Sequence, residues 1–262
     1  MKLAISNIAW AAEQDDAIYD LMRKYGYTGL EIAPTRIFPK QPYARLKEAT
    51  AWRNRLHNQY GFVIPSMQSI WFGRTERIFG SETEQKVLLD YTRQAIDFAS
   101  AISCHNLVFG CPKNRSMPES ACLDTAASFF RKIAEYALAC GTVIGFEANP
   151  GIYNTNYINT TQEALQLIET VDSAGFRLNL DVGTMLYNNE SVEELAGKVK
   201  YLSHVHISEP WLAAVSKRQL HRELADCLRT EGYCGFVSVE MAKQESLQPI
   251  VNALEIVRNI FA

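Results

Sequence analysis

The chain has 262 residues, of which 47% are hydrophobic and 21% charged, a balance typical of a globular protein with a large core. Its 26 basic residues are outnumbered by 29 acidic ones and form no run, so we expect no binding to nucleic acid. No apolar segment approaches the roughly 20 residues of a membrane span, and the start MKLAISNIAW lacks the features of a signal peptide. We therefore expect a cytoplasmic protein with no membrane partner.

Short apolar segments rich in β-branched residues alternate along the chain with longer stretches of helical periodicity. The expected strands are Lys2–Ser6, Gly29–Ile32, Val63–Gln68, Asn106–Phe109, Val143–Glu147, Arg177–Asp181, His204–Ile207 and Phe236–Glu240. The expected helices are Asp15–Tyr25, Tyr43–Tyr60, Glu84–Ala101, Cys122–Ala139, Thr161–Val171, Val192–Lys200, Arg218–Glu231 and Leu247–Phe261. Eight such alternations in a chain of this length favour a closed parallel barrel with its helices outside. The sequence thus predicts an α/β protein in which residues 1–262 form a single (β/α)8 barrel domain.

An open, doubly wound sheet is the alternative arrangement of alternating strands and helices. Such a sheet usually carries the phosphate-binding pattern G-x-G-x-x-G directly after its first strand. The corresponding segment here, ISNIAW, contains no glycine. We therefore favour the closed barrel.

Each of the last four expected strands has one polar and one apolar face. Near their C-terminal ends lie Glu147, Asp181, His206 and Glu240, separated by 34, 25 and 34 residues. Because side chains alternate between the faces of a strand, all four are expected to point into the barrel. Each separation is close to one strand-helix unit, so the four residues should lie on adjacent strands. The C-terminal end of the strands is where active sites of this architecture lie.

Three carboxylates and an imidazole that face one another would repel unless a positive charge is shared among them. Mixed oxygen and nitrogen ligands suit Mn²⁺, Mg²⁺, Co²⁺ or Zn²⁺. The pattern therefore predicts a site for one divalent metal ion. The alternative is that the four residues are unrelated polar groups that cap separate loops, and their recurrence on four consecutive strands makes this the weaker interpretation.

Several residues in the expected loops are candidates for substrate binding. Lys113 and Arg115, in the segment GCPKNR, should stand over the barrel mouth, where they could bind a phosphate, a carboxylate or a nucleotide-linked sugar, or remain solvated charges. Trp10 and Trp71 are expected to form walls of a sugar pocket, with a subunit contact as the alternative. Asn149 could donate to sugar hydroxyls or stabilise its own turn.

Two further residues are expected near the four strand-end groups. Glu31 ends the second strand and could join the pocket, but we favour a structural hydrogen bond for it. His204 shares a face with His206 and lies one layer deeper, so we expect it to support the site from the barrel interior.

Four segments of the second half resemble a known family. They read GFEANP, LDVGT, HVHISE and SVEM, at Gly145–Pro150, Leu180–Thr184, His204–Glu209 and Ser238–Met241. They resemble the xylose isomerase-like TIM barrel superfamily, and within it the sugar phosphate isomerase/epimerase group that includes ketose 3-epimerases. The resemblance implies a metal-dependent isomerase or epimerase of a sugar or sugar phosphate, which transfers a proton next to a carbonyl through an enediolate. It also implies a small carbohydrate as the partner.

The resemblance carries roles over to individual residues. It implies that Glu147, Asp181, His206 and Glu240 bind one metal ion, and that Glu147 and Glu240 form the catalytic acid and base pair. Members of the group often associate through their barrel faces, so a homo-oligomer is compatible with the sequence.

The chain departs from the family pattern at two places. Many relatives have a histidine where Thr184 stands, three residues after Asp181. After His206, relatives often carry an arginine and a glycine-rich turn, whereas this chain reads PWLAAVSKRQLH, so Arg218 or His221 could bind substrate instead.

These departures leave two alternatives to an isomerase open. One is a sugar-binding barrel that has lost catalysis. The other is a phosphodiesterase like endonuclease IV, which needs several further histidines. The corresponding neighbourhoods contain Gln68, Gly110 and Thr184, so we do not favour it.

Overall fold

Eight parallel strands form a barrel in the computed structural model, which describes residues 1–119 and 123–262. The strands are β1 (Lys2–Ser6), β2 (Gly29–Glu31), β3 (Ser66–Met67), β4 (Asn106–Phe109), β5 (Val143–Phe146), β6 (Phe176–Asp181), β7 (Leu202–Ile207) and β8 (Phe236–Val239). Their order in the sheet is β2-β1-β8-β7-β6-β5-β4-β3. Isolated parallel bridges from Gly29 to Val63 and from Ile32 to Met67 join the two ends of this order. The predicted (β/α)8 TIM barrel is confirmed.

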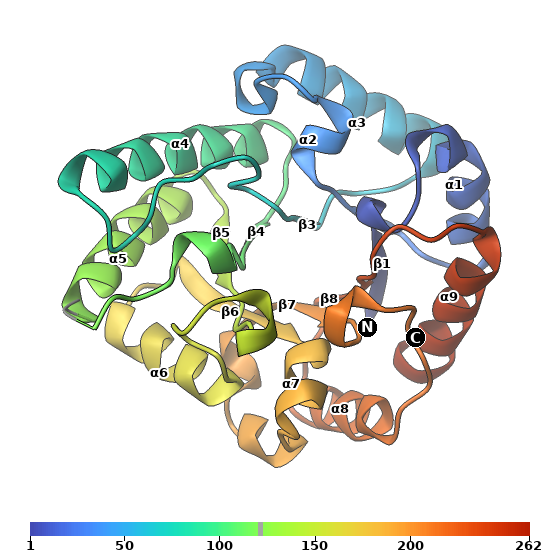
Figure 1. Cartoon of the computed structure of the whole chain (residues 1–262). Helices are drawn as coiled ribbons and strands as arrows, with labels where there is room; N and C mark the ends of the chain where they lie inside the picture. Colours follow the sequence, from blue (N-terminus) through green and yellow to red (C-terminus); the bar gives the residue numbers. More distant parts are fainter. Residues whose placement is uncertain (120–122) are drawn as a thin grey trace.

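The helices surround the strands (Figure 1). They are α1 (Asp15–Lys24), α2 (Pro34–Ile37), α3 (Leu46–Tyr60), α4 (Glu82–Ala101), α5 (Leu123–Ala139), α6 (Thr161–Val171), α7 (Val182–Asn188), α8 (Gln219–Thr230) and α9 (Leu247–Phe261). Reciprocal capping boxes, Ser81 with Glu84 and Thr160 with Glu163, begin α4 and α6. None of the described helices is both long and apolar enough to cross a bilayer.

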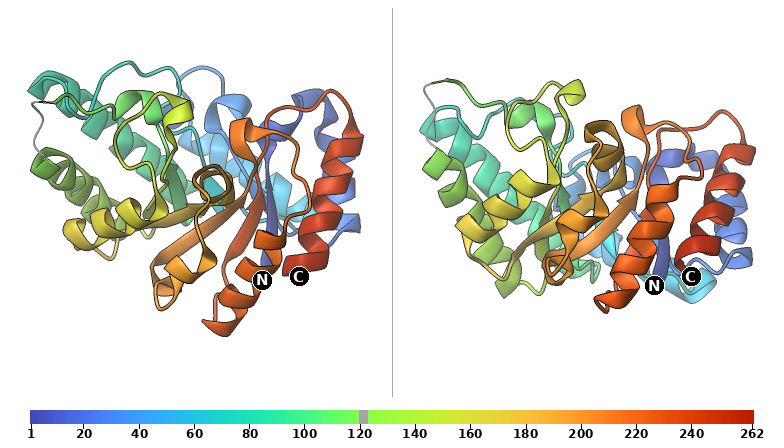
Figure 2. Two further views of the ribbon diagram at one scale, coloured as in Figure 1. Left: turned by 60° about the horizontal axis from the view of Figure 1, so that its bottom comes forward. Right: turned by 90° about the horizontal axis from the view of Figure 1, so that it is seen from below.

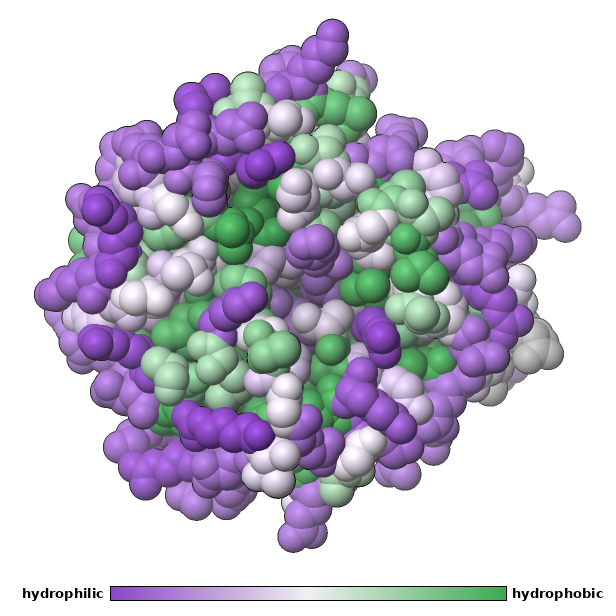
Figure 3. Space-filling model, turned by 180° about the vertical axis from the view of Figure 1, so that it is seen from behind, coloured by the Kyte–Doolittle hydropathy of each residue, from purple (hydrophilic) through white to green (hydrophobic). Residues whose placement is uncertain are grey.

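The two ends of the barrel differ in what they carry. Both termini lie at one end, and the longer loops that follow the strands lie at the other (Figure 2). On the end away from these loops, hydrophilic side chains form most of the outer ring and hydrophobic ones gather in smaller patches nearer the middle (Figure 3). The loops at the C-terminal ends of the strands therefore surround the mouth at which the candidate residues were expected.

Some predicted boundaries were wrong. The strand expected over Val63–Gln68 is regular only at Ser66–Met67, because Pro65 has no N–H for the sheet. The helix expected over Val192–Lys200 is two 3-10 turns, Val192–Leu195 and Val199–Tyr201, between which Gly197 has φ +68.

The remaining helix predictions differ in smaller ways. The helix of the sixth unit is α7, which starts directly from the end of β6. Helix α3 begins at Leu46, after a 3-10 turn at Pro42–Ala44, and not at Tyr43. Cys122, the expected start of the helix in the fourth unit, lies outside the described residues.

An aromatic cluster packs the helices against the strands that carry the site. Phe109 of β4 and Phe146 of β5 stack with ring centroids 5.8 Å apart. Phe130 of α5 meets them edge-on at 5.0 and 5.2 Å, and Phe176 of β6 lies 5.1 Å from Phe130. All four rings are buried. This packing fixes β4, β5 and β6 relative to one another, and with them the polar side chains on the opposite face.

Replacement of Phe130 by alanine should destabilise the protein by about 3–5 kcal/mol, because it removes a buried ring on which three strands pack. Urea unfolding measures this free energy. Phe72→Ala is the matched control, since the Phe72 side chain is 69% exposed and its loss should change stability by no more than about 0.5 kcal/mol. Equal effects of the two substitutions would contradict the assignment of the core.

Candidate metal centre

Four side chains from consecutive strands converge at the mouth of the barrel. Ligand atoms of Glu147, Asp181, His206 and Glu240 all lie within 4.8 Å of one another. Asp181 is paired with His206 in the register of β6 and β7. The N–H groups of Glu147 and Glu240 donate to the carbonyls of Phe109 and Ile207, at 3.1 and 3.0 Å, and so continue the sheet beyond β5 and β8. Side chains therefore continue to alternate between the two faces as far as Glu147 and Glu240, each one residue beyond its strand.

The His206 imidazole is the centre of this group and is completely buried. Its Nδ1 lies 2.9 Å from Glu147 Oε1 and 3.2 Å from Glu240 Oε2. Its Nε2 lies 3.0 and 3.1 Å from the two oxygens of Glu31. One ring nitrogen thus faces the pocket, and the other faces a carboxylate in the barrel interior.

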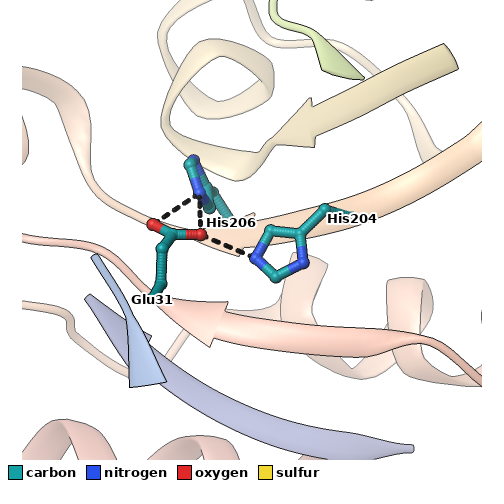
Figure 4. A group of neighbouring side chains, drawn as sticks. All are labelled: Glu31, His204 and His206. Carbon is teal, nitrogen blue, oxygen red and sulfur yellow. Dashed lines mark hydrogen bonds and ion pairs between the residues drawn. The ribbon is translucent and has the colours of Figure 1, made fainter. Parts of the chain in front are cut away.

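Glu31, His204 and His206 form a buried triangle (Figure 4). His204 Nε2 lies 2.8 Å from Glu31 Oε2, and Gln68 Nε2 donates to Glu31 Oε1 at 2.9 Å. Burial alone would raise the pKa of Glu31, but the charge of His206 and the contacts with both histidines hold it well below its usual range. Glu31 is therefore an anion that fixes the His206 ring from the side away from the pocket.

The Glu147 carboxylate is oriented by two asparagines. Asn179 Nδ2 donates to Oε1 at 2.8 Å, and Asn149 Nδ2 donates to Oε2 at 3.1 Å. Arg115 in turn donates to the Glu147 carbonyl at 2.7 Å and to Asn149 Oδ1 at 3.0 Å. This network holds both the backbone and the side chain of Glu147.

Asp181 has a second role as the N-cap of α7. Its Oδ2 accepts hydrogen bonds from the Thr184 N–H at 2.7 Å and from Thr184 Oγ1 at 2.8 Å, and its Oδ1 accepts one from Ser208. Ser208 Oγ also accepts from the Gly183 N–H at 2.8 Å. Thr184 therefore serves to orient the aspartate.

Burial and the neighbouring charges shift the pKa values of the site. Burial raises the pKa of Asp181 to about 6, and the nearby Glu147 carboxylate acts in the same direction. Burial also raises the pKa of Glu240 to about 7, with His206 opposing this and Glu147 and Asp181 adding to it. Burial would lower the pKa of His206, but Glu240, Glu31 and Glu147 together raise it well above its usual value. The group therefore contains more negative charge than its own imidazole balances.

Three of the four side chains, Glu147, Asp181 and Glu240, line a small pocket of about 180 Å³. Tyr153 and Leu212, from the loops after β5 and β7, also line it. The two loops meet where the Trp211 N–H donates to Tyr153 Oη at 3.0 Å. The pocket is below the about 300–1,000 Å³ typical of drug-sized ligands, so it fits an ion with part of a small molecule.

These residues fit a divalent cation. Three carboxylates and one imidazole nitrogen supply the mixed oxygen and nitrogen donors that such ions accept, and their atoms surround one point. Burial raises the pKa values of Asp181 and Glu240, and a cation held beside these carboxylates would favour their ionised forms. Glu31 supplies the carboxylate behind the histidine that is typical of metal-binding histidines.

Arg115 and Lys113 do not stand over the pocket as expected. The Arg115 side chain is completely buried, with its guanidinium 4.8 Å from the centre of the Phe146 ring. Burial lowers its pKa to about 10, and its hydrogen bonds go to Glu147, Asn149 and the Ile158 carbonyl. Lys113 is exposed and lines an adjoining hollow beside the loop after β3, not the 180 Å³ pocket itself. The loop after β4 directs Arg115 into the core beside Glu147 and Phe146. The spacing of residues in GCPKNR did not predict this direction.

The other predicted binding residues are also placed differently, apart from Asn149, which lines the pocket. Trp71 is buried and donates from Nε1 to Thr92 Oγ1 at 2.8 Å. Trp10 donates to Asp15 Oδ1 at 2.7 Å and borders a neighbouring groove. His221 is buried on α8 beside Phe261. None of these three lines the 180 Å³ pocket.

Sequence reasoning gave no role to Asn179, Ser208 or Tyr153. The first two carry a usable signal, because each lies two residues from a predicted ligand and so shares its face. Tyr153 carries no such signal, since it belongs to an irregular loop.

Comparisons with known proteins agree with the barrel fold. A family model described as Xylose isomerase-like TIM barrel matches residues 19–260. D-psicose 3-epimerase from Clostridium cellulolyticum H10, solved with D-tagatose, is 18% identical with a TM-score of 0.75, over 99% of this chain and 91% of that one. 3-Keto-D-glucoside 4-epimerase YcjR from E. coli is 18% identical with a TM-score of 0.77, over 99% of both chains. The IOLI protein, solved with a zinc atom, is 15% identical with a TM-score of 0.72, over 99% of this chain and 96% of that one. No match to a curated protein sequence was found.

Titration with Mn²⁺ should show about one ion per chain and the release of at least one proton at pH 7. His206 is protonated at this pH, because its pKa is raised, and only the neutral imidazole binds a metal. The apparent affinity should therefore rise as the pH rises. Calorimetry in two buffers with different ionisation enthalpies counts the protons. A binding enthalpy that is equal in both buffers would contradict the location of the ion at His206 Nδ1.

Proposed function

The chain belongs to the xylose isomerase-like TIM barrel family, and on this premise we propose that it is a sugar isomerase or epimerase that uses one divalent metal ion. The observation that carries the proposal is the convergence of Glu147, Asp181, His206 and Glu240 on one point of the barrel mouth. Solved structures of similar fold include a D-psicose 3-epimerase and a 3-keto-D-glucoside 4-epimerase. These likenesses support a ketose or keto-sugar as the substrate.

Glu147, Asp181, His206 and Glu240 would hold the ion. When bound, a divalent ion polarises a carbonyl and a neighbouring hydroxyl and so acidifies the C–H bond between them. The donor set suits Mn²⁺, Mg²⁺, Co²⁺ or Zn²⁺. Asn149 lines the pocket, and the second N–H of its side-chain amide would donate to a sugar hydroxyl.

Glu147 and Glu240 are the proposed acid and base. They come from β5 and β8, which β6 and β7 separate in the sheet, so the two carboxylates reach the pocket from different sides. One removes a proton from the substrate carbon, and the other can return a proton to the opposite face. The pKa of Glu240, raised to about 7 by burial, suits a group that both accepts and donates a proton near neutral pH.

Glu147→Gln and Glu240→Gln should each lower proton exchange by at least about 100-fold, because an amide cannot accept the proton. The measurement is deuterium incorporation next to the carbonyl of D-fructose or D-tagatose in D₂O, followed by NMR. Glu169→Gln is the matched control, since Glu169 is exposed on α6, and it should exchange at the unaltered rate. Metal content measured on each variant separates a lost base from a lost ligand. If the unaltered protein exchanges no deuterium into ketoses or their phosphates, the proposed function is wrong.

Glu31→Gln should weaken metal binding by about 10- to 100-fold, although Glu31 does not line the pocket. The substitution removes the negative charge at Nε2, on the side of the His206 ring away from Glu147 and Glu240. The amide oxygen also accepts the hydrogen bond from Nε2 less strongly than a carboxylate does. Competition with a metal-sensitive dye measures the affinity without reference to activity. Arg36→Gln changes a charged residue outside the centre and serves as the control. An unchanged affinity in Glu31→Gln would show that the buried triangle only supports the fold.

A further inference from the structure

A second, larger hollow lies beside the metal pocket. It has a volume of about 810 Å³ and is bordered by the loops after β1, β2 and β3. Ser69, in the loop after β3, lines both this groove and the 180 Å³ pocket. The metal pocket therefore adjoins, at Ser69, a hollow that is large enough for a further group of the substrate.

The groove has an aromatic rim. Phe72 is 69% exposed, the largest exposed fraction among the large hydrophobic residues of the described chain. A tight turn presents it, because the Phe72 N–H donates to the Ser69 carbonyl and the Arg74 N–H to that of Trp71, both at 2.9 Å. Trp71 anchors the turn in the core. An exposed aromatic ring on a held turn can contact a ligand with little further loss of conformational freedom.

Most of the charge that lines the groove is neutralised by ion pairs. Arg36 is paired with Asp15 at 2.6 Å. The guanidinium of Arg74 is paired with Glu76, with Nε 3.0 Å from Oε2. Lys243 is the remaining charged residue among those that line the groove.

Hydroxyl and amide groups from Thr35, Gln41 and Ser69 complete the lining, together with Trp10 and Tyr91. Aromatic faces combined with a few neutral hydrogen-bonding groups are typical of sites for small organic ligands. A phosphate, in contrast, is usually bound by several unpaired cations or by the N-terminus of a long helix.

We propose that this groove binds a second, uncharged sugar ring, attached to the keto sugar that the metal pocket holds. The substrate class is then a keto sugar in glycosidic linkage, rather than a free monosaccharide or a sugar phosphate. This proposal rests on the proposed isomerase or epimerase function. Phe72 stacks on the second ring and thus determines specificity, while the acid and base act on the first ring.

Three substrates with the same ketose head test the proposal. They are D-fructose, D-fructose 6-phosphate and isomaltulose, which carries a glucosyl group on O6 of fructose. For each, kcat/KM is measured from deuterium incorporation next to the carbonyl in D₂O. Isomaltulose should exceed D-fructose by about tenfold, the size expected of one aromatic contact, and should also exceed the phosphate. Phe72→Ala should bring the isomaltulose to fructose ratio close to one, and Phe72→Tyr should restore it. Leu138→Ala removes an exposed side chain of α5 and should leave the ratio as it is.

The outcomes separate this proposal from the function on which it rests. Exchange that is equal for D-fructose and isomaltulose, or faster for the phosphate, would overturn the second-ring site and leave the isomerase or epimerase in place. A ratio that Phe72→Ala does not alter would do the same. Absence of exchange with all three substrates would overturn the proposed function itself, and this proposal with it.

Discussion

Buried carboxylates need positive charge close by, and this requirement organises the mouth of the barrel. Four carboxylates, those of Glu31, Glu147, Asp181 and Glu240, lie around the single His206 ring or beside its partners. His204 adds little positive charge, because burial lowers its pKa. Even a protonated His206 therefore leaves an excess of negative charge. The neighbouring carboxylates add to the rise that burial gives to the pKa values of Asp181 and Glu240, and a divalent cation would balance the excess negative charge.

The surrounding structure keeps these charges at fixed positions. Arg115 is buried beneath Glu147 and holds its backbone, while Asn149 and Asn179 hold its carboxylate. On the outer side of the same strands, the cluster of phenylalanine rings prevents the strands from shifting. The apolar face of these strands fixes the backbone, and the polar face carries the metal-binding side chains. The position of those side chains can be no more precise than that of the backbone.

The alternation of strands with helices was sufficient to predict the barrel. The alternation of side chains along each strand, with the spacing of the units, predicted the convergence of Glu147, Asp181, His206 and Glu240. These features depend on local periodicity and on the regular length of each strand-helix unit. Glu31 could not be assigned in this way, because β2 and β7 are not neighbours in the sheet. Its contact with His206 crosses the barrel interior and depends on the curvature of the closed sheet.

The loop residues were the least predictable for a related reason. Arg115 and Trp71 are chemically suited to a substrate pocket, but the path of an irregular loop decides which way a side chain points. Two adjacent residues, Trp71 and Phe72, illustrate this: one is buried in the core and the other projects into solvent. Helix α7 was missed because its capping residue, Asp181, was interpreted only as a ligand.

That double use of Asp181 has a mechanical consequence. The carboxylate that faces the pocket also accepts the Thr184 N–H in the first turn of α7, and it is linked to the end of β7 through Ser208. The direction of one donor to the ion is thereby tied to the tilt of a short helix near the surface. Any contact that displaces α7 would rotate this oxygen relative to the other three donors. The stiffness of the helix therefore contributes to how firmly an ion is retained, in addition to the chemistry of the four side chains.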